Sequence, residues 1–90
     1  NAEDSVAILR GIVGSYPKAF FAVERTNLED FVTKLTAITS EQDYRQLKDR
    51  YAIRRTNQDF WQFADKLHAW YFKHQPESAG LLDFNRLENR

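Results

Sequence analysis

The sequence FWQFADKLHAWY, from Phe60 to Tyr71, repeats apolar side chains at the spacing of an α-helix. Its apolar residues cover an arc that is too wide for contact with one neighbour, which predicts burial against more than one element. Thr56 precedes Asp59 by three residues, so we expect a capped helix start at Thr56. Pro76 is expected to end the helix. The aromatic arc could also line an acyl-chain pocket, but a stripe at helical spacing more often belongs to a core.

Two further helices are predicted upstream of this one. The first has an apolar stripe at i, i+3, i+4, i+7 and i+10, formed by Leu28, Phe31, Val32, Leu35 and Ile38. Thr26 and Asn27 are both suitable caps for its start. The second is expected to begin at Ser40, with Asp43 three residues later. Its narrower apolar stripe consists of Tyr44, Leu47 and Tyr51.

The N-terminal part is predicted to form a short antiparallel β-pair. The run from Ser5 to Val13 is apolar on both alternating faces and rich in β-branched residues, which is typical of a strand covered on both sides. So short a run could also be a buried helix. The turn-forming residues 14–17 lead to a second expected strand at residues 19–24. The predicted fold class is therefore α+β: a short antiparallel β-pair, three helices and an extended C-terminal tail.

The expected tail runs from Ala79 to Arg90. It carries more apolar residues than a free tail would leave in water: Leu81, Leu82, Phe84 and Leu87. Arg86 and Arg90 have acidic residues available to them on the first two helices. We expect the tail to be ordered against the domain, although a frayed terminus is an open alternative.

Composition limits the classes of protein to which the chain can belong. Ninety residues, 42% of them hydrophobic and 14% aromatic, suit one domain with a core that needs no disulfide. The formal net charge of zero argues against nucleic acid as a partner and gives no electrostatic attraction to anionic lipid. The sequence contains no cysteine, so thiolate chemistry and thioether attachment of haem are excluded within it. No apolar run is long enough to span a bilayer.

The chain is expected to be a piece of a larger protein. It contains no methionine, and Asn1 and Ala2 resemble the scar that a protease leaves after cloning. Residues 1–90 are therefore expected to be a single domain excised from a larger protein, with residues 1–2 as the scar.

Few residues are candidates for chemistry. His68 and His74 are six residues apart, so they point in different directions on a helix and cannot share a metal ion. Asp65 and His68 can touch at i, i+3, as in a catalytic carboxylate–histidine pair. The alternative is a surface hydrogen bond, or a half-buried imidazole beside Trp61 and Tyr71. No catalytic residue and no metal ligand is predicted.

Basic residues supply the remaining candidates. Arg54 and Arg55 precede Phe60 and Trp61, which could form a phosphate-binding and stacking surface, but neighbouring acidic residues offset the charge. A solvated helix face with a connector is the simpler interpretation. The candidate binding residues are Arg54, Arg55, Asp65, His68, Arg86 and Arg90.

Several segments together resemble a known family. They are Arg10–Pro17 followed by Phe20-Phe21, Arg54-Arg55-Thr56 leading to Phe60-Trp61, Asp65 with His68, and Ala79–Asp83 running into Asn85–Arg90. In combination they resemble the C-terminal region of bacterial fatty acid cis/trans isomerases. The resemblance implies a periplasmic enzyme that converts cis-unsaturated acyl chains of membrane phospholipids to the trans form.

The resemblance also implies a haem, because these isomerases are similar to cytochromes in carrying a Cys-x-x-Cys-His attachment motif. This chain departs from that pattern, since it has no cysteine. Haem c and the chemistry are then expected in another part of the parent protein. This domain would be a non-catalytic structural or docking domain, with the remainder of the parent as its partner and phospholipid acyl chains reached only through the parent. A small protein–protein interaction module of unrelated function is the alternative.

Overall fold

Five helices make up most of the chain in the computed structural model, which describes residues 2–38, 40–52 and 57–74. In chain order they are α1 (Ala2–Gly14), α2 (Lys18–Val23), α3 (Arg25–Leu35), α4 (Glu41–Ala52) and α5 (Gln58–Lys73). These ranges contain no strand, so the predicted α+β class and its antiparallel β-pair are wrong. The expected tail, residues 79–90, lies outside the described residues.

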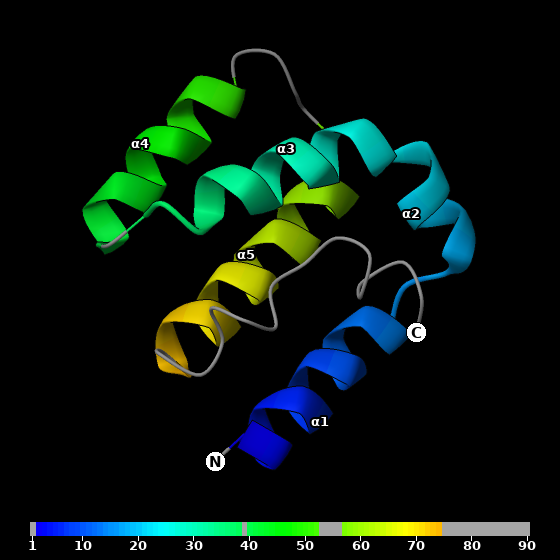
Figure 1. Ribbon diagram of the computed structural model, residues 1–90. Helices are drawn as coiled ribbons and strands as arrows, with labels where there is room; N and C mark the ends of the chain where they lie inside the picture. Colours follow the sequence, from blue (N-terminus) through cyan, green and yellow to red (C-terminus); the bar gives the residue numbers. More distant parts are fainter. Residues whose placement is uncertain (1, 39, 53–56, 75–90) are drawn as a thin grey trace.

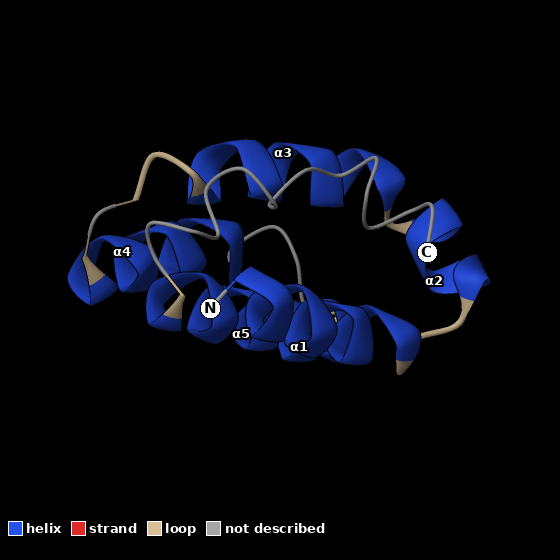
Figure 2. Cartoon of the chain, turned by 60° about the horizontal axis from the view of Figure 1, so that its bottom comes forward, coloured by secondary structure: helices blue, strands red, loops and turns tan. Residues whose placement is uncertain are grey.

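Helix α5 occupies the centre of the molecule. Figure 1 shows α1 beside α5 on one side, with α3 and α4 on the other. In the turned view of Figure 2, α3 forms an upper layer above α1, α5 and α4. The wide apolar arc of α5 is explained by this arrangement, because the helix has neighbours on several sides.

Helix α1 replaces the first predicted strand. Ser5, Leu9 and Val13 are buried at a spacing of four residues, which is the period of a helix with one face against the core. The indole Nε1 of Trp70 on α5 donates a hydrogen bond of 2.8 Å to the carbonyl oxygen of Ser5. Ile8, on another side of α1, is 43% exposed. The apolar residues of this segment that do not face the core, such as Ile8, lie on the exposed side of a helix. They were mistaken for the second buried face of a strand.

The short helix α2 replaces the second predicted strand. Pro17 stands at its N-cap with φ of −71°, where its missing N–H costs no helical hydrogen bond. The N–H of Phe20 donates to the carbonyl oxygen of Pro17 at 3.0 Å. Glu24 follows α2 and serves as the N-cap residue of α3, so the two helices are joined by a single residue. Phe21 is the buried residue of α2.

The three predicted helices are confirmed as α3, α4 and α5, with small shifts of their ends. Helix α3 begins at Arg25, before both expected caps. The cap of α4 is as predicted, since the N–H of Asp43 donates to Ser40 Oγ at 3.1 Å. Helix α5 is capped by Asn57 in place of Thr56: the Asn57 side chain accepts from the N–H groups of Asp59 at 2.9 Å and Phe60 at 3.3 Å.

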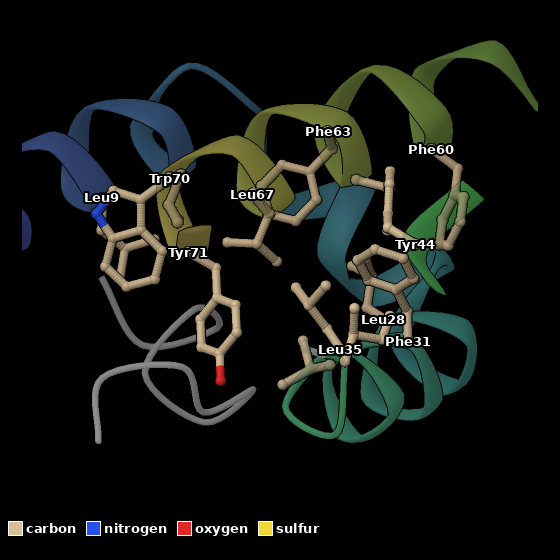
Figure 3. Packing of buried hydrophobic residues seen from close by; sticks show 14 of the residues in the cluster. Leu9, Leu28, Phe31, Leu35, Tyr44, Phe60, Phe63, Leu67, Trp70 and Tyr71 are labelled. Carbon is tan, nitrogen blue, oxygen red and sulfur yellow. The ribbon is translucent and has the colours of Figure 1, made fainter. Parts of the chain in front are cut away.

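The core lies between α5 and the other helices, as Figure 3 shows. Aromatic rings fill much of it, in edge-to-face contacts that suit their quadrupoles. Phe63 has ring neighbours at 5.1 Å in Tyr16, 5.5 Å in Phe20 and 5.5 Å in Phe21. The interpretation of the α5 arc as core is confirmed by its buried residues, which are Phe60, Phe63, Ala64, Leu67, Trp70 and Tyr71. Among the described helices, none has the length and hydropathy needed to cross a membrane.

Candidate functional site

Four side chains form a polar cluster between α4 and α5, which we call the α4–α5 cluster: Tyr44, Lys48, Asp65 and His68. The Tyr44 hydroxyl donates a hydrogen bond of 2.7 Å to Asp65 Oδ1. Lys48 Nζ donates to both carboxylate oxygens of Asp65, at 3.1 Å and 2.9 Å. The same ammonium lies 5.6 Å from the ring centroid of Trp61. Two residues of α4 thus converge on one carboxylate of α5.

His68 lies inside this cluster and is held by rings. Its imidazole stacks on the Tyr44 ring with centroids 3.6 Å apart and planes 6° from parallel. Phe72 approaches it edge-on at 4.6 Å. His68 is 7% exposed, and its Nε2 atom is enclosed with no hydrogen-bond partner in the described part of the chain. The ring is therefore packed as an apolar group would be.

Burial shifts the proton equilibria of both stacked rings. It lowers the pKa of His68, while the nearby carboxylates of Glu41 and Asp65 act in the opposite direction. The pKa of Tyr44 is raised, first by burial and then by its hydrogen bond to Asp65 and the charge of that carboxylate. At neutral pH Tyr44 is accordingly a protonated donor and His68 an uncharged ring.

The structure places Asp65 and His68 near each other on α5 but gives them different contacts. Both residues belong to the α4–α5 cluster, but the hydrogen bonds given above join Asp65 to Tyr44 and Lys48, whereas His68 stacks on Tyr44. Tyr44 and Phe72 are rings that contact His68 in the described part of the chain, whereas the sequence suggested Trp61 and Tyr71. The other four candidate residues lie outside the described residues: Arg54, Arg55, Arg86 and Arg90.

A second polar contact joins the N-terminal helix to the end of α5. Ser5 Oγ lies 3.0 Å from His74 Nδ1, a distance that would suit a nucleophile and its base. Ser5 is fully buried, however, so its hydroxyl cannot reach a substrate in this structure. The contact fixes α1 against α5. Sequence reasoning missed it because 69 positions separate the two residues.

Metal ligands do not gather in the described ranges, where no group of three or more His, Cys, Asp or Glu side chains could hold an ion. The α4–α5 cluster and the contact between Ser5 and His74 both join two helices. Neither of these two contacts presents a nucleophile to a substrate.

Substitution of Tyr44 by phenylalanine tests the contribution of the hydroxyl to this positioning. The variant keeps the stacked ring and removes one donor to a charged acceptor, whose side chain is 46% exposed. We expect the free energy of unfolding to fall by about 1 kcal/mol, because solvent partly replaces the lost bond. Urea denaturation followed by circular dichroism measures this. Arg45→Ala on the exposed side of α4 is the control and should be nearly neutral. Equal losses in the two variants would contradict the assignment.

A family model described as fatty acid cis/trans isomerase (CTI) matches residues 1–89. No curated protein and no solved structure matches the chain. The matched range contains almost the whole sequence, including the α4–α5 cluster and the contact between Ser5 and His74.

Proposed function

The chain belongs to the fatty acid cis/trans isomerase family, and we propose that it is a non-catalytic structural and docking domain of such an isomerase. In this proposal the isomerase acts in the periplasm on cis-unsaturated acyl chains of membrane phospholipids. The partner of the domain is the remainder of the isomerase, through which it is connected to lipid. Nucleic acid is not a partner, in keeping with the net charge of zero.

One observation supports the non-catalytic role: in the part of the chain that the structure describes, the candidate side chains for proton transfer, Asp65, His68 and Ser5, are used in contacts between helices. Asp65 accepts from two residues of α4, and His68 stacks on Tyr44 and makes a T-shaped contact with Phe72. The hydroxyl of Ser5 is buried against His74. General acid–base catalysis requires a group within reach of the substrate, and these groups are enclosed or engaged.

The donor set of this chain does not fit a covalently attached haem. Thioether attachment requires cysteine thiols, and the sequence has none. The Nε2 atoms of His68 and His74 are both enclosed by protein. We therefore place haem c and the isomerisation chemistry in another part of the isomerase, and assign no step of the reaction to this domain.

The experiment is an isomerase assay with three matched samples: the chain alone, a family isomerase that contains this domain, and the same isomerase with the domain deleted. Each is incubated with vesicles of a cis-monounsaturated phospholipid, and trans fatty acids are quantified by gas chromatography. We expect no trans product from the chain alone, with or without added haem, and product from the intact isomerase. Trans product formed by the chain alone would refute the non-catalytic role.

Docking is tested separately with the same samples, by co-elution in size-exclusion chromatography. The chain should co-elute with the isomerase from which the domain has been deleted. Failure to co-elute would contradict docking, whatever the activity of the chain.

A further inference from the structure

We propose that the stack of His68 on Tyr44 is a proton-sensitive latch, which holds α4 on α5 while His68 is neutral and loosens when His68 takes up a proton. The inference is independent of the proposed function, because it concerns the attachment of one helix and not the reaction of the isomerase.

Tyr44 is the main anchor of α4 among residues 40–50, whose side chains the structure describes. It is the one buried residue in this range, whereas Leu47 and Lys48 are half-buried and the other charged residues are exposed. Its ring makes a T-shaped contact with Phe31 on α3, at 6.2 Å, and stacks on His68 on α5. Its hydroxyl adds the bond to Asp65. A change in the charge of His68 therefore acts on the contact that anchors this part of α4.

Protonation converts His68 from a neutral ring into an enclosed cation against the Tyr44 ring. Both ring nitrogens carry a proton in the cation, and Nε2 has no acceptor in the described part of the chain, so its N–H would be buried without a hydrogen bond. The groups that face the ring from α4 are the carboxylate of Glu41, the hydroxyl-bearing ring of Tyr44 and, through Asp65, the ammonium of Lys48. From α5 it is faced by the carboxylate of Asp65.

These groups do not act in the same direction. Glu41, Asp65 and the π-face of Tyr44 favour a cation, whereas burial opposes it. Lys48 binds both oxygens of Asp65, so its ammonium offsets part of the attraction between that carboxylate and a protonated His68. The lowered pKa of His68 agrees with a net balance in which burial prevails.

The sign of the pH dependence follows from this direction. A histidine released from the stack recovers its ordinary pKa of 6.5, which lies above that of the latched ring. The released state therefore binds the proton more tightly. Above the ordinary pKa of histidine, the latch makes its full contribution to the attachment of α4 to α5. This contribution decreases as the pH falls from the ordinary pKa towards the lower pKa of the latched His68. Below the lower pKa there is no further loss.

Hydrogen exchange of the whole 90-residue chain at about pH 7.5 and about pH 5.5, corrected for intrinsic rates, tests the latch. We expect the opening equilibrium of α4 amides, such as those of Tyr44 and Leu47, to rise several-fold on acidification. Amides in the middle of α5, near Leu67, should change much less. In the variant His68→Phe, which keeps an aromatic face for Tyr44, the acid-induced opening of α4 should disappear. The matched control is His74→Gln, which removes the other imidazole of the chain and should retain it.

The proposal is overturned if α4 opens equally at both pH values, or if His74→Gln abolishes the effect and His68→Phe does not. A measurement on the unmodified chain makes the test independent of whether a variant folds. The ring resonances of His68, followed by NMR, should titrate below those of an unfolded-peptide histidine. Titration at or above the ordinary value would exclude the latch.

Discussion

Replacement of Phe63 by alanine is expected to lower the free energy of unfolding by about 3–5 kcal/mol, the range for loss of a buried aromatic ring. Phe63 is fully buried, and its ring is in edge contact with Tyr16, Phe20 and Phe21. Those three residues belong to α2 and the connector before it. The cavity would therefore open between α5 and the segment that leads from α1 to α3, where no neighbouring side chain is free to fill it without disturbing the other rings.

Urea denaturation followed by circular dichroism measures the loss for Phe63→Ala. The variant Phe63→Leu is the matched control, because it keeps most of the apolar volume and should cost less than half as much. If Phe63→Ala reduced the free energy of unfolding by less than about 1 kcal/mol, the packing of α2 against α5 described here would be incorrect.

The sequence was sufficient to identify the helices whose apolar residues recur with one unambiguous period. In α3, positions 28, 31, 32 and 35 are all buried, because a stripe at this spacing can face a core only if the segment is helical. The cap at Ser40 was also predictable, since it depends on a hydroxyl three residues before an N–H in the same segment. Signals of this kind are local and need no knowledge of the neighbouring elements.

The two N-terminal elements were mispredicted because their sequence permits more than one period. Ser5, Leu9 and Val13 fit a helix, but the apolar residues between them also fit a two-sided strand. The deciding contacts are distant in sequence, such as the bond from Trp70 to the carbonyl oxygen of Ser5. The apolar run at residues 19–24 follows a turn signal and was interpreted as a strand, whereas Pro17 supplies the start of a helix, α2.

The candidate site was only half predictable for the same reason. Asp65 and His68 could be selected because they share one helix and a spacing of three residues. Tyr44 and Lys48 come from α4, and their relation to Asp65 depends on how α4 lies along α5. Sequence spacing within α4 placed Tyr44 on an apolar stripe, but it carried no information on the acceptor that its hydroxyl would meet.

Truncation of Leu35 or Leu67 to alanine is the second large expected effect, at about 2–5 kcal/mol for each variant. Both side chains are fully buried. Figure 3 shows them entering the core from different helices, Leu35 from α3 and Leu67 from α5. Loss of either side chain removes its transfer free energy and leaves a cavity that rigid aromatic neighbours such as Phe31 and Phe63 cannot fill by small rotations.

Val23→Ala is the matched control for these two variants, since Val23 is 77% exposed and its truncation should change the free energy of unfolding by less than about 0.5 kcal/mol. The comparison separates cavity formation from a general effect of shortening an aliphatic side chain. Urea midpoints and slopes should be measured for all variants, because an unchanged slope shows that the loss belongs to the native state. Losses in Leu35→Ala and Leu67→Ala that matched the Val23 control would mean that α3 and α5 do not enclose a common core. Losses in the expected range in both variants, with an unchanged slope, would show that Leu35 of α3 and Leu67 of α5 are enclosed in the native core.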